Sequence, residues 1–97
     1  MKRRVAVTGL GVVSPVGIGL KTFWSNLVAG KSGITNITSF DTTDFPVKIA
    51  GEVKDFNASD FIADRKAVRH MDRDSQFALA AAIMAAEDSG LDISKRL

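Results

Sequence analysis

The chain has 97 residues, of which 45% are hydrophobic and 25% charged, with 13 Lys and Arg against 11 Asp and Glu. This composition is typical of at most one small soluble domain and excludes a disordered chain. The net charge of +2 is too small to indicate nucleic-acid binding. The sequence has no cysteine and one histidine. Its own residues therefore exclude a disulfide framework, a thiolate or multi-histidine metal site and a cysteine nucleophile.

The apolar stretches of the sequence do not indicate a membrane protein. The longest, residues 77–86, is too short to span a bilayer. The basic start at residues 2–4 resembles the beginning of a secretory signal, but glycines and Pro15 interrupt the apolar stretch after it and no small-residue cleavage site follows. We therefore expect a cytoplasmic protein without a membrane segment.

The first elements predicted along the chain are a strand, a loop and a helix. Residues 5–13 are almost continuously apolar and rich in β-branched side chains, which is typical of a strand buried on both faces of a parallel sheet. Glycines and Pro15 predict a loop at residues 14–19. Apolar side chains at helical spacing then predict a helix at residues 20–29, which Gly30 ends.

The middle of the chain is predicted as loop, strand and short helix. Residues 31–46 are rich in small polar residues and predict a long ordered loop. Alternating apolar residues predict a second strand at residues 47–53. Ser59 or Asp60 is predicted to cap a short helix that reaches Asp64 and beyond.

A longer helix is predicted near the end, at residues 75–89, with Asp72 or Asp74 as its cap and Gly90 as its stop. All ten residues of 77–86 are apolar. A helix that is apolar all round is normally buried all round, and the other elements of a 97-residue chain cannot enclose it. We therefore expect the chain to be part of a larger fold or of an assembly.

Two glycine motifs suggest nucleotide binding, and both fail on context. Gly9 and Gly11 follow a predicted strand, but Ser14 stands where the third glycine of a dinucleotide fingerprint belongs. Tight packing explains these glycines better. Residues 30–32 match the end of a phosphate-binding loop, but they follow a helix instead of preceding one.

The most charged segment spans residues 65–73. It contains Arg65, Lys66, Arg69, His70 and Arg73. If the whole segment is helical, Arg65, Arg69 and Arg73 share one face. Such a run is usually a solvated surface, and the functional alternative is docking of an acidic partner. No aromatic residue is interleaved, which disfavours nucleic acid. The lone His70 is expected at the surface.

Taken together in chain order, short pieces of the sequence resemble the β-ketoacyl-acyl-carrier-protein synthases. The matching pieces are residues 4–17, Phe23-Trp24, residues 27–34, Phe40-Asp41, residues 49–53, Asp55-Phe56, residues 71–73, residues 76–80 and residues 88–91. Their order and spacing cover essentially the whole chain. The resemblance is strongest to the synthase II branch of bacterial type II fatty acid synthesis, and polyketide ketosynthases share most of the pieces.

The resemblance implies an α/β chain that forms the amino-terminal segment of a thiolase-like fold, with layered helices and a mixed sheet. Residues 1–97 would be an incomplete domain whose partners are the remainder of the synthase, usually as a homodimer, and acyl-carrier protein. The family condenses an acyl thioester with malonyl-carrier protein by decarboxylation, using one cysteine and two histidines. No separate cofactor is implied, because substrates arrive on the phosphopantetheine arm of the carrier.

No catalytic, cofactor-binding or metal-binding residue transfers to this sequence. The family's cysteine and histidines lie beyond the part that matches, so the 97-residue chain alone is expected to be inactive. One functional region does transfer. It resembles the surface of synthase II that meets acyl-carrier protein, and its candidate docking residues are Arg65, Lys66, Arg69 and His70. His70 stands where a lysine is common. The competing interpretations are a polyketide ketosynthase and a short non-catalytic protein that binds carrier protein.

Overall fold

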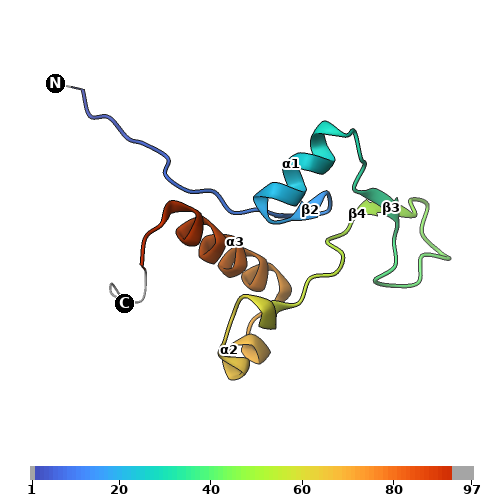
Figure 1. Cartoon of the computed structure of the whole chain (residues 1–97). Coiled ribbons are helices and arrows are strands. Elements are labelled where there is room, and N and C mark those ends of the chain that lie inside the picture. Colours follow the sequence, from blue (N-terminus) through green and yellow to red (C-terminus); the bar gives the residue numbers. More distant parts are fainter. Residues whose placement is uncertain (1, 93–97) are drawn as a thin grey trace. The chain divides into compact units, whose positions relative to one another are not determined.

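The computed structural model describes residues 2–92. The chain divides into two compact units, and Figure 1 shows its elements in sequence colours. Val13–Phe56 forms one unit, and the segments Met1–Val12 and Asn57–Leu97 form the other. The prediction of a mixed α/β chain is confirmed, because both helices and strands are present.

The unit Val13–Phe56 begins with a tight hairpin. Strand β1 (Val13–Ser14) pairs antiparallel with β2 (Gly17–Ile18). The Ser14 hydroxyl accepts hydrogen bonds from the backbone amides of Val16 and Gly17, both at 3.2 Å. The loop predicted at residues 14–19 is therefore confirmed only as the turn at residues 15–16, because Ser14 and β2 are strand residues within it.

Helix α1 (Leu20–Val28) follows directly, as the apolar spacing predicted. The side-chain amide of Asn26 donates to the Val16 carbonyl over 2.7 Å and so holds α1 to the first hairpin. Gly30 adopts a left-handed φ of 74° and ends the helix, because a residue without a β-carbon enters this region at little cost. Residues 30–32 therefore follow a helix and do not cradle a phosphate at a helix start.

A second hairpin joins β3 (Ile34–Asn36) to β4 (Ile49–Gly51), with Ile34 opposite Gly51 and Asn36 opposite Ile49. The strand predicted at residues 47–53 is confirmed in its central part. The prediction of loop throughout residues 31–46 is wrong, because β3 lies within it. Three residues of a polar stretch carry no period of their own, and their pairing with β4 is what makes them a strand.

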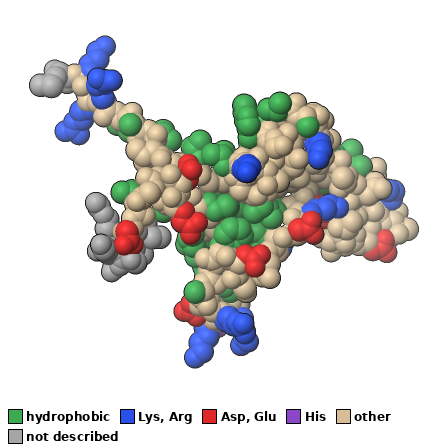
Figure 2. All heavy atoms as spheres, viewed as in Figure 1, with side chains coloured by type: hydrophobic (Ala, Val, Ile, Leu, Met, Phe, Trp, Pro, Cys, Tyr) green, Lys and Arg blue, Asp and Glu red, His purple; other side chains and the backbone are tan. Residues whose placement is uncertain are grey.

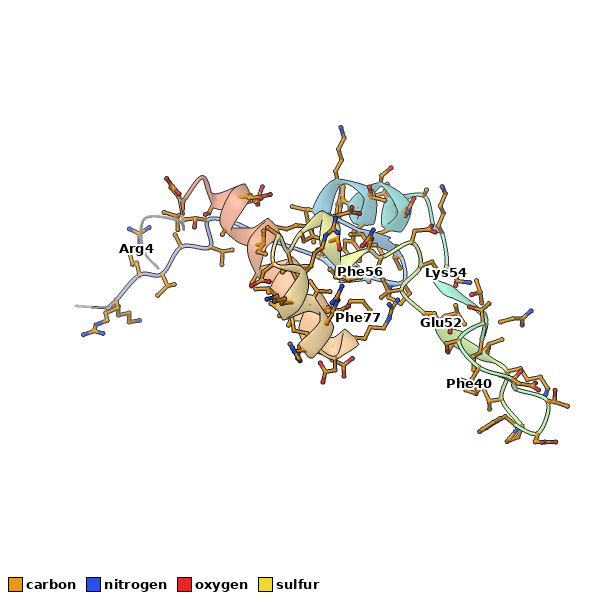
Figure 3. The ribbon with its side chains drawn as sticks, turned by 90° about the horizontal axis from the view of Figure 1, so that it is seen from below. Arg4, Phe40, Glu52, Lys54, Phe56 and Phe77 are labelled. Atoms are coloured by element: carbon orange, nitrogen blue, oxygen red, sulfur yellow. The ribbon has the colours of Figure 1, made fainter. Side chains whose placement is uncertain are left out.

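Glu52, next to β4, closes the loop that joins the two strands. Its carboxylate accepts from the backbone amide of Thr38 at 2.9 Å, from the Thr38 hydroxyl at 3.1 Å and from the backbone amide of Ser39 at 3.1 Å. Glu52 and Phe40 are both labelled on this hairpin in Figure 3. The hydrogen bonds from Thr38, first of all its backbone amide, and from Ser39 lower the pKa of Glu52 from 4.5 to about 2.

The second unit contains three helical elements. They are a 3₁₀ turn η1 (Ala58–Asp60), helix α2 (Arg65–His70) and helix α3 (Arg73–Ser89). The long helix predicted at residues 75–89 is confirmed and begins two residues earlier. Its cap is Asp72, one of the two candidates, and Gly90 ends it with a left-handed φ of 77°.

The predicted caps of the short helix are wrong. Ser59 and Asp60 lie inside η1, which the Asn57 side chain caps by accepting from the Ser59 amide. Helix α2 is capped by Asp64, whose position in extended backbone lets its side chain reach the first amides of the helix.

The strand predicted at residues 5–13 is also wrong for all but its last residue. Val5 and Val7 are 93% and 78% exposed, and residues 2–12 form no strand. A strand needs a neighbour whose backbone accepts and donates its hydrogen bonds, and no described residue pairs with this segment. The predicted parallel sheet is therefore not seen. The two described strand pairs are antiparallel.

Residues 9–11 instead lie against α3, as the blue trace beside the red helix shows in Figure 1. A β-carbon on Gly9 would collide with the Ala85 carbonyl oxygen, and one on Gly11 with the Ala81 carbonyl oxygen. Between them, the Leu10 amide donates to the Asp88 carboxylate at 2.9 Å. Close packing explains the two glycines, as the sequence predicted, and no dinucleotide site is needed.

The full burial predicted for residues 77–86 is not seen within the described residues. Ala80 is completely buried, but Ala78 and Ala82 are exposed and most of the others are half-buried. The elements that the structure describes therefore do not enclose this apolar helix, which agrees with the expectation that it needs further neighbours.

We expect Gly11→Ala to lower the free energy of unfolding by about 1–3 kcal/mol, because the added methyl group meets backbone that cannot move aside. Chemical denaturation measures this. The neighbouring exposed Thr8 provides the control, and Thr8→Ala should change stability by less than about 0.5 kcal/mol. Equal effects of the two substitutions would contradict the close contact with α3.

We also expect the chemical shifts of the Thr38 and Ser39 amide protons to follow the ionisation of Glu52. Their midpoint should lie at about pH 2, which is the pKa of Glu52 in the folded chain. An unfolded chain titrates this carboxyl near 4.5, so the hydrogen bonds stabilise the folded hairpin above that pH and are lost as the pH falls toward 2. Nuclear magnetic resonance (NMR) shifts measured against pH test this.

In the Glu52→Gln variant the chemical shifts of these two amide protons should no longer change with pH in this range. Asp44→Asn, which removes an exposed carboxylate from the same loop, should leave the midpoint unchanged. A midpoint near 4.5 in the unaltered chain would contradict the hydrogen bonds from Thr38 and Ser39 to Glu52.

Candidate functional site

The four candidate docking residues all lie on α2. Arg65, Lys66, Arg69 and His70 are all exposed, whereas Ala67 and Val68 are half-buried. At 3.6 residues per turn the four side chains span an arc of roughly 140°. In Figure 2, blue side chains project from the part of the surface that α2 forms. The helix thus presents a continuous basic face, which we call the α2 basic face.

The electrostatics of α2 favour cations at one end. Asp64 accepts from the backbone amides of Lys66 at 3.0 Å and Ala67 at 3.2 Å, which neutralises the positive end of the helix. Arg69 and His70 occupy the last turn, where the helix dipole stabilises positive charge. Within residues 2–92, none of the four side chains forms an ion pair with a described carboxylate.

The position of α2 is set by a residue of the next helix. The side-chain amide of Gln76, in the first turn of α3, donates to the carbonyl oxygens of Val68 at 3.2 Å and Met71 at 3.4 Å. The Val68 carbonyl also accepts from the Met71 backbone amide at 3.2 Å, so Gln76 adds a second donor there and supplies one to the carbonyl of Met71 just after the helix. Both α2 and α3 also contact η1.

The prediction that Arg65, Arg69 and Arg73 share one helical face is wrong. Helix α2 ends at His70, and Asp72 adopts extended backbone in which its carboxylate accepts from the Ser75 amide at 2.8 Å. The Ser75 side chain and backbone lower the pKa of Asp72. Arg73 therefore begins a new helix, where its guanidinium carbon lies 4.9 Å from the centroid of the Phe77 ring.

Sequence reasoning found the basic residues and missed the one that positions them. A glutamine in the first turn of a helix gives no signal by itself, because its role depends on carbonyls of another element. The break before Arg73 was predicted in part, since Asp72 was one of the two candidate caps of the next helix. The shared face of Arg65, Arg69 and Arg73 required a continuous helix through Asp72 and so conflicted with that cap.

Chemically, the cationic side chains of this surface can bind anions. The sequence contains no cysteine, and His70 is its one histidine. Among residues 2–92 no three His, Cys, Asp or Glu side chains are grouped as a metal site would require. In the same part of the chain no helix is both long enough and apolar enough to cross a membrane.

We expect Gln76→Glu to loosen α2, because a carboxylate of the same size cannot donate to the carbonyls of Val68 and Met71. The free energy of unfolding should fall by about 1–3 kcal/mol. Two hydrogen bonds are lost, and the new carboxylate oxygen faces the carbonyl oxygens of Val68 and Met71, which are also acceptors. Amide exchange in residues 67–70 should accelerate. Asp74→Asn, on the exposed side of the same turn, is the control and should not accelerate it. Unaltered exchange in Gln76→Glu would contradict the proposed bridge.

Comparison with protein families places the chain. The family described as "Beta-ketoacyl synthase, N-terminal domain" matches residues 2–96. The 3-oxoacyl-acyl-carrier-protein synthase 2 of Coxiella burnetii is 50% identical over 94 residues, and that of Vibrio cholerae is 48% identical over 94 residues. In both cases the match covers 97% of this chain and 22% of the relative, so the chain spans about a fifth of the length of these relatives.

Two solved structures are also similar. The ishigamide ketosynthase/chain length factor has a TM-score of 0.88 and 41% identity, covering 97% of this chain and 23% of that one. A type II polyketide synthase acyl-carrier protein in complex with its ketosynthase bound to the hexaketide has a TM-score of 0.67 and 38% identity, covering 97% of this chain and 21% of that one. The sequence match and the shared architecture agree with the resemblance found in the sequence. The chain belongs to the β-ketoacyl synthase family, in its amino-terminal domain.

Proposed function

We propose that this chain is the amino-terminal part of a 3-oxoacyl-acyl-carrier-protein synthase II. Such an enzyme elongates acyl chains in fatty acid biosynthesis by decarboxylating condensation of an acyl thioester with malonyl-carrier protein. The observation that carries this proposal is the 50% identity to a synthase 2 over 97% of the chain.

The proposed role of this chain is to bind acyl-carrier protein and to position it on the synthase. Condensation needs an activated nucleophile and groups that stabilise developing negative charge. The sequence supplies no cysteine, and its one histidine lies on the exposed face of a short helix. We therefore assign it no catalytic residue. The α2 basic face would instead bind acidic acyl-carrier protein, which brings its substrate on its own phosphopantetheine arm. No further cofactor is proposed.

Three properties of the α2 basic face support the docking role. Its four residues are exposed, they carry no ion pair to a described residue, and they stand on a helix whose ends are capped and bridged. A solved ketosynthase of similar sequence forms a complex with its acyl-carrier protein. A basic surface of this kind accelerates encounter with an acidic partner.

The proposed fold of the complete protein is thiolase-like, with layered helices and a mixed sheet. The similar solved structures are ketosynthases, and this supports the proposal. The half-exposed apolar α3 would be covered in the same structure. We further propose a cytoplasmic protein that acts as a homodimer.

The second candidate function is that of a polyketide ketosynthase. The similar solved structures include one from a type II polyketide synthase. Identity to the fatty acid synthases is higher, at 50% and 48% against 41% and 38%. This difference makes fatty acid synthesis the first proposal. Assaying the complete synthase for condensation of saturated acyl-carrier protein separates the two, since a polyketide enzyme should prefer substrates that retain keto groups.

We expect the double variant Lys66→Glu/Arg69→Glu to bind acyl-carrier protein about tenfold more weakly at low salt, because two attractive charges become repulsive. The control Lys21→Glu/Lys31→Glu changes the net charge equally on α1 and the loop after it. It should lower affinity by no more than about twofold. Calorimetric titration measures both. Equal losses in the two variants would show that net charge, and not the α2 basic face, determines binding.

We also expect the 97-residue chain alone to form no 3-ketoacyl product from acyl- and malonyl-carrier protein. Mass spectrometry of the carrier-bound products measures this, with an active synthase II as the positive control. Turnover by the isolated chain would contradict the assignment of catalysis to other residues. Carrier binding without turnover by every longer form would favour the non-catalytic binding protein.

A further inference from the structure

We propose that the two cap carboxylates of Asp64 and Asp72 restrict the α2 basic face to partners whose acidic groups lie within a short patch, and that they repel extended polyanions. This inference rests on the proposed docking function. It names the kind of acidic partner that the face accepts and two residues that determine this specificity.

The formal charges of the segment around α2 cancel. Between residues 57 and 76, four acidic side chains oppose four permanently basic ones, which are Asp60, Asp64, Asp72 and Asp74 against Arg65, Lys66, Arg69 and Arg73. A segment without net charge attracts a distant anion weakly, because salt screens what remains of the field. Its attraction for an acidic partner must therefore come from the arrangement of these charges at close range.

Asp64 fixes a negative charge at the start of α2. Its side chain is exposed, and one carboxylate oxygen accepts from the backbone amides of Lys66 at 3.0 Å and Ala67 at 3.2 Å. These bonds hold the carboxylate against the first turn of the helix. An anion that extends past this end of the basic face would meet a like charge that is held in place.

Asp72 fixes a second negative charge just past the other end. Its exposed carboxylate accepts from the Ser75 amide at 2.8 Å. It stands two residues after His70, the last residue of α2, so their α-carbons lie no more than about 7 Å apart. The side-chain amide of Gln76 joins the end of α2 to the first turn of α3, which keeps this carboxylate near the face.

The permanent cations of the face therefore lie between two fixed carboxylates. Helix α2 has six residues, a length of about 9 Å, and carries Arg65, Lys66 and Arg69. Figure 2 shows acidic side chains beside the basic ones on this part of the surface. A partner with a compact acidic patch reaches the cations without approaching either carboxylate. A long polyanion must pass at least one of them, and such like-charge contacts exclude wrong partners.

The experiment measures the affinity of three chains for two anionic ligands at one pH and one ionic strength. The ligands are purified acidic acyl-carrier protein and long poly-L-glutamate, whose charges repel one another and extend it. The chains are the unaltered one, the cap variant Asp64→Asn/Asp72→Asn and the control Asp44→Asn/Glu87→Gln. Asparagine caps a helix about as well as aspartate, so the cap variant should keep its helices. The control changes the net charge equally, on the loop between β3 and β4 and in the last turn of α3.

We expect the cap variant to bind poly-L-glutamate about tenfold more tightly than the unaltered chain, because each exposed charge pair changes affinity by about two- to fivefold. Its affinity for the carrier protein should rise by no more than about twofold, since the carrier does not contact the caps. In the control, neither affinity should rise by more than about twofold. A second cap variant, Asp64→Ser/Asp72→Ser, should repeat the result, because serine also caps helices without a charge.

The outcomes separate this inference from the proposal beneath it. Equal gains for the two ligands, or no gain for poly-L-glutamate, would overturn the inference and leave docking intact. An equal gain in the control would overturn it as well, since net charge would then explain the effect. A gain in one cap variant without the other would assign it to altered folding and would also contradict the inference. Absence of carrier binding by all of the chains would overturn the docking function, and this inference with it.

Discussion

The unit built from both ends of the described chain depends on the approach of a bare backbone to a helix of small residues. Gly9 and Gly11 lie so close to Ala81 and Ala85 that neither position could carry a β-carbon. The Leu10 amide donates to Asp88, a residue 78 positions away. Dispersion contacts of this kind require small side chains on one partner and none on the other. The close contact between the two glycines and the alanines of α3 therefore holds residues 9–11 against that helix.

This contact also shows which parts of the fold were predictable. Helices α1 and α3 were predicted because periodicity, caps and terminal glycines are local signals, and Gly30 and Gly90 adopt the left-handed conformation that such stops use. The strands were predicted poorly because pairing is not local. Residues 34–36 became a strand only opposite residues 49–51, and residues 5–12 have the composition of a strand without a described partner.

The candidate site likewise has a part that could be predicted from the sequence and a part that could not. The identity of the basic residues followed from composition and from the family resemblance. Their grouping did not, because Asp72 interrupts the helix and separates Arg73 from the α2 basic face. The role of Gln76 could not be predicted for a related reason. Its function resides in two carbonyls that belong to the end of another helix, and no property of the sequence around residue 76 identifies them.

A six-residue helix is too short to be stable alone, so α2 must derive its order from its surroundings. Asp64 satisfies its first amides, Gln76 satisfies carbonyls at its end, and η1 contacts it. The exposed Asp64 accepts the first pair of hydrogen bonds, the half-buried Gln76 donates the second pair, and the third contact is with a 3₁₀ turn that holds the buried Ala58. The basic face is thus presented by a helix whose position is inherited from α3, and α3 in turn is fixed by the glycine backbone of residues 9–11. A change at that distant contact should therefore alter the position of α2 through Gln76. The geometry of the α2 basic face thus depends on the packing of the whole unit and not on the basic residues alone.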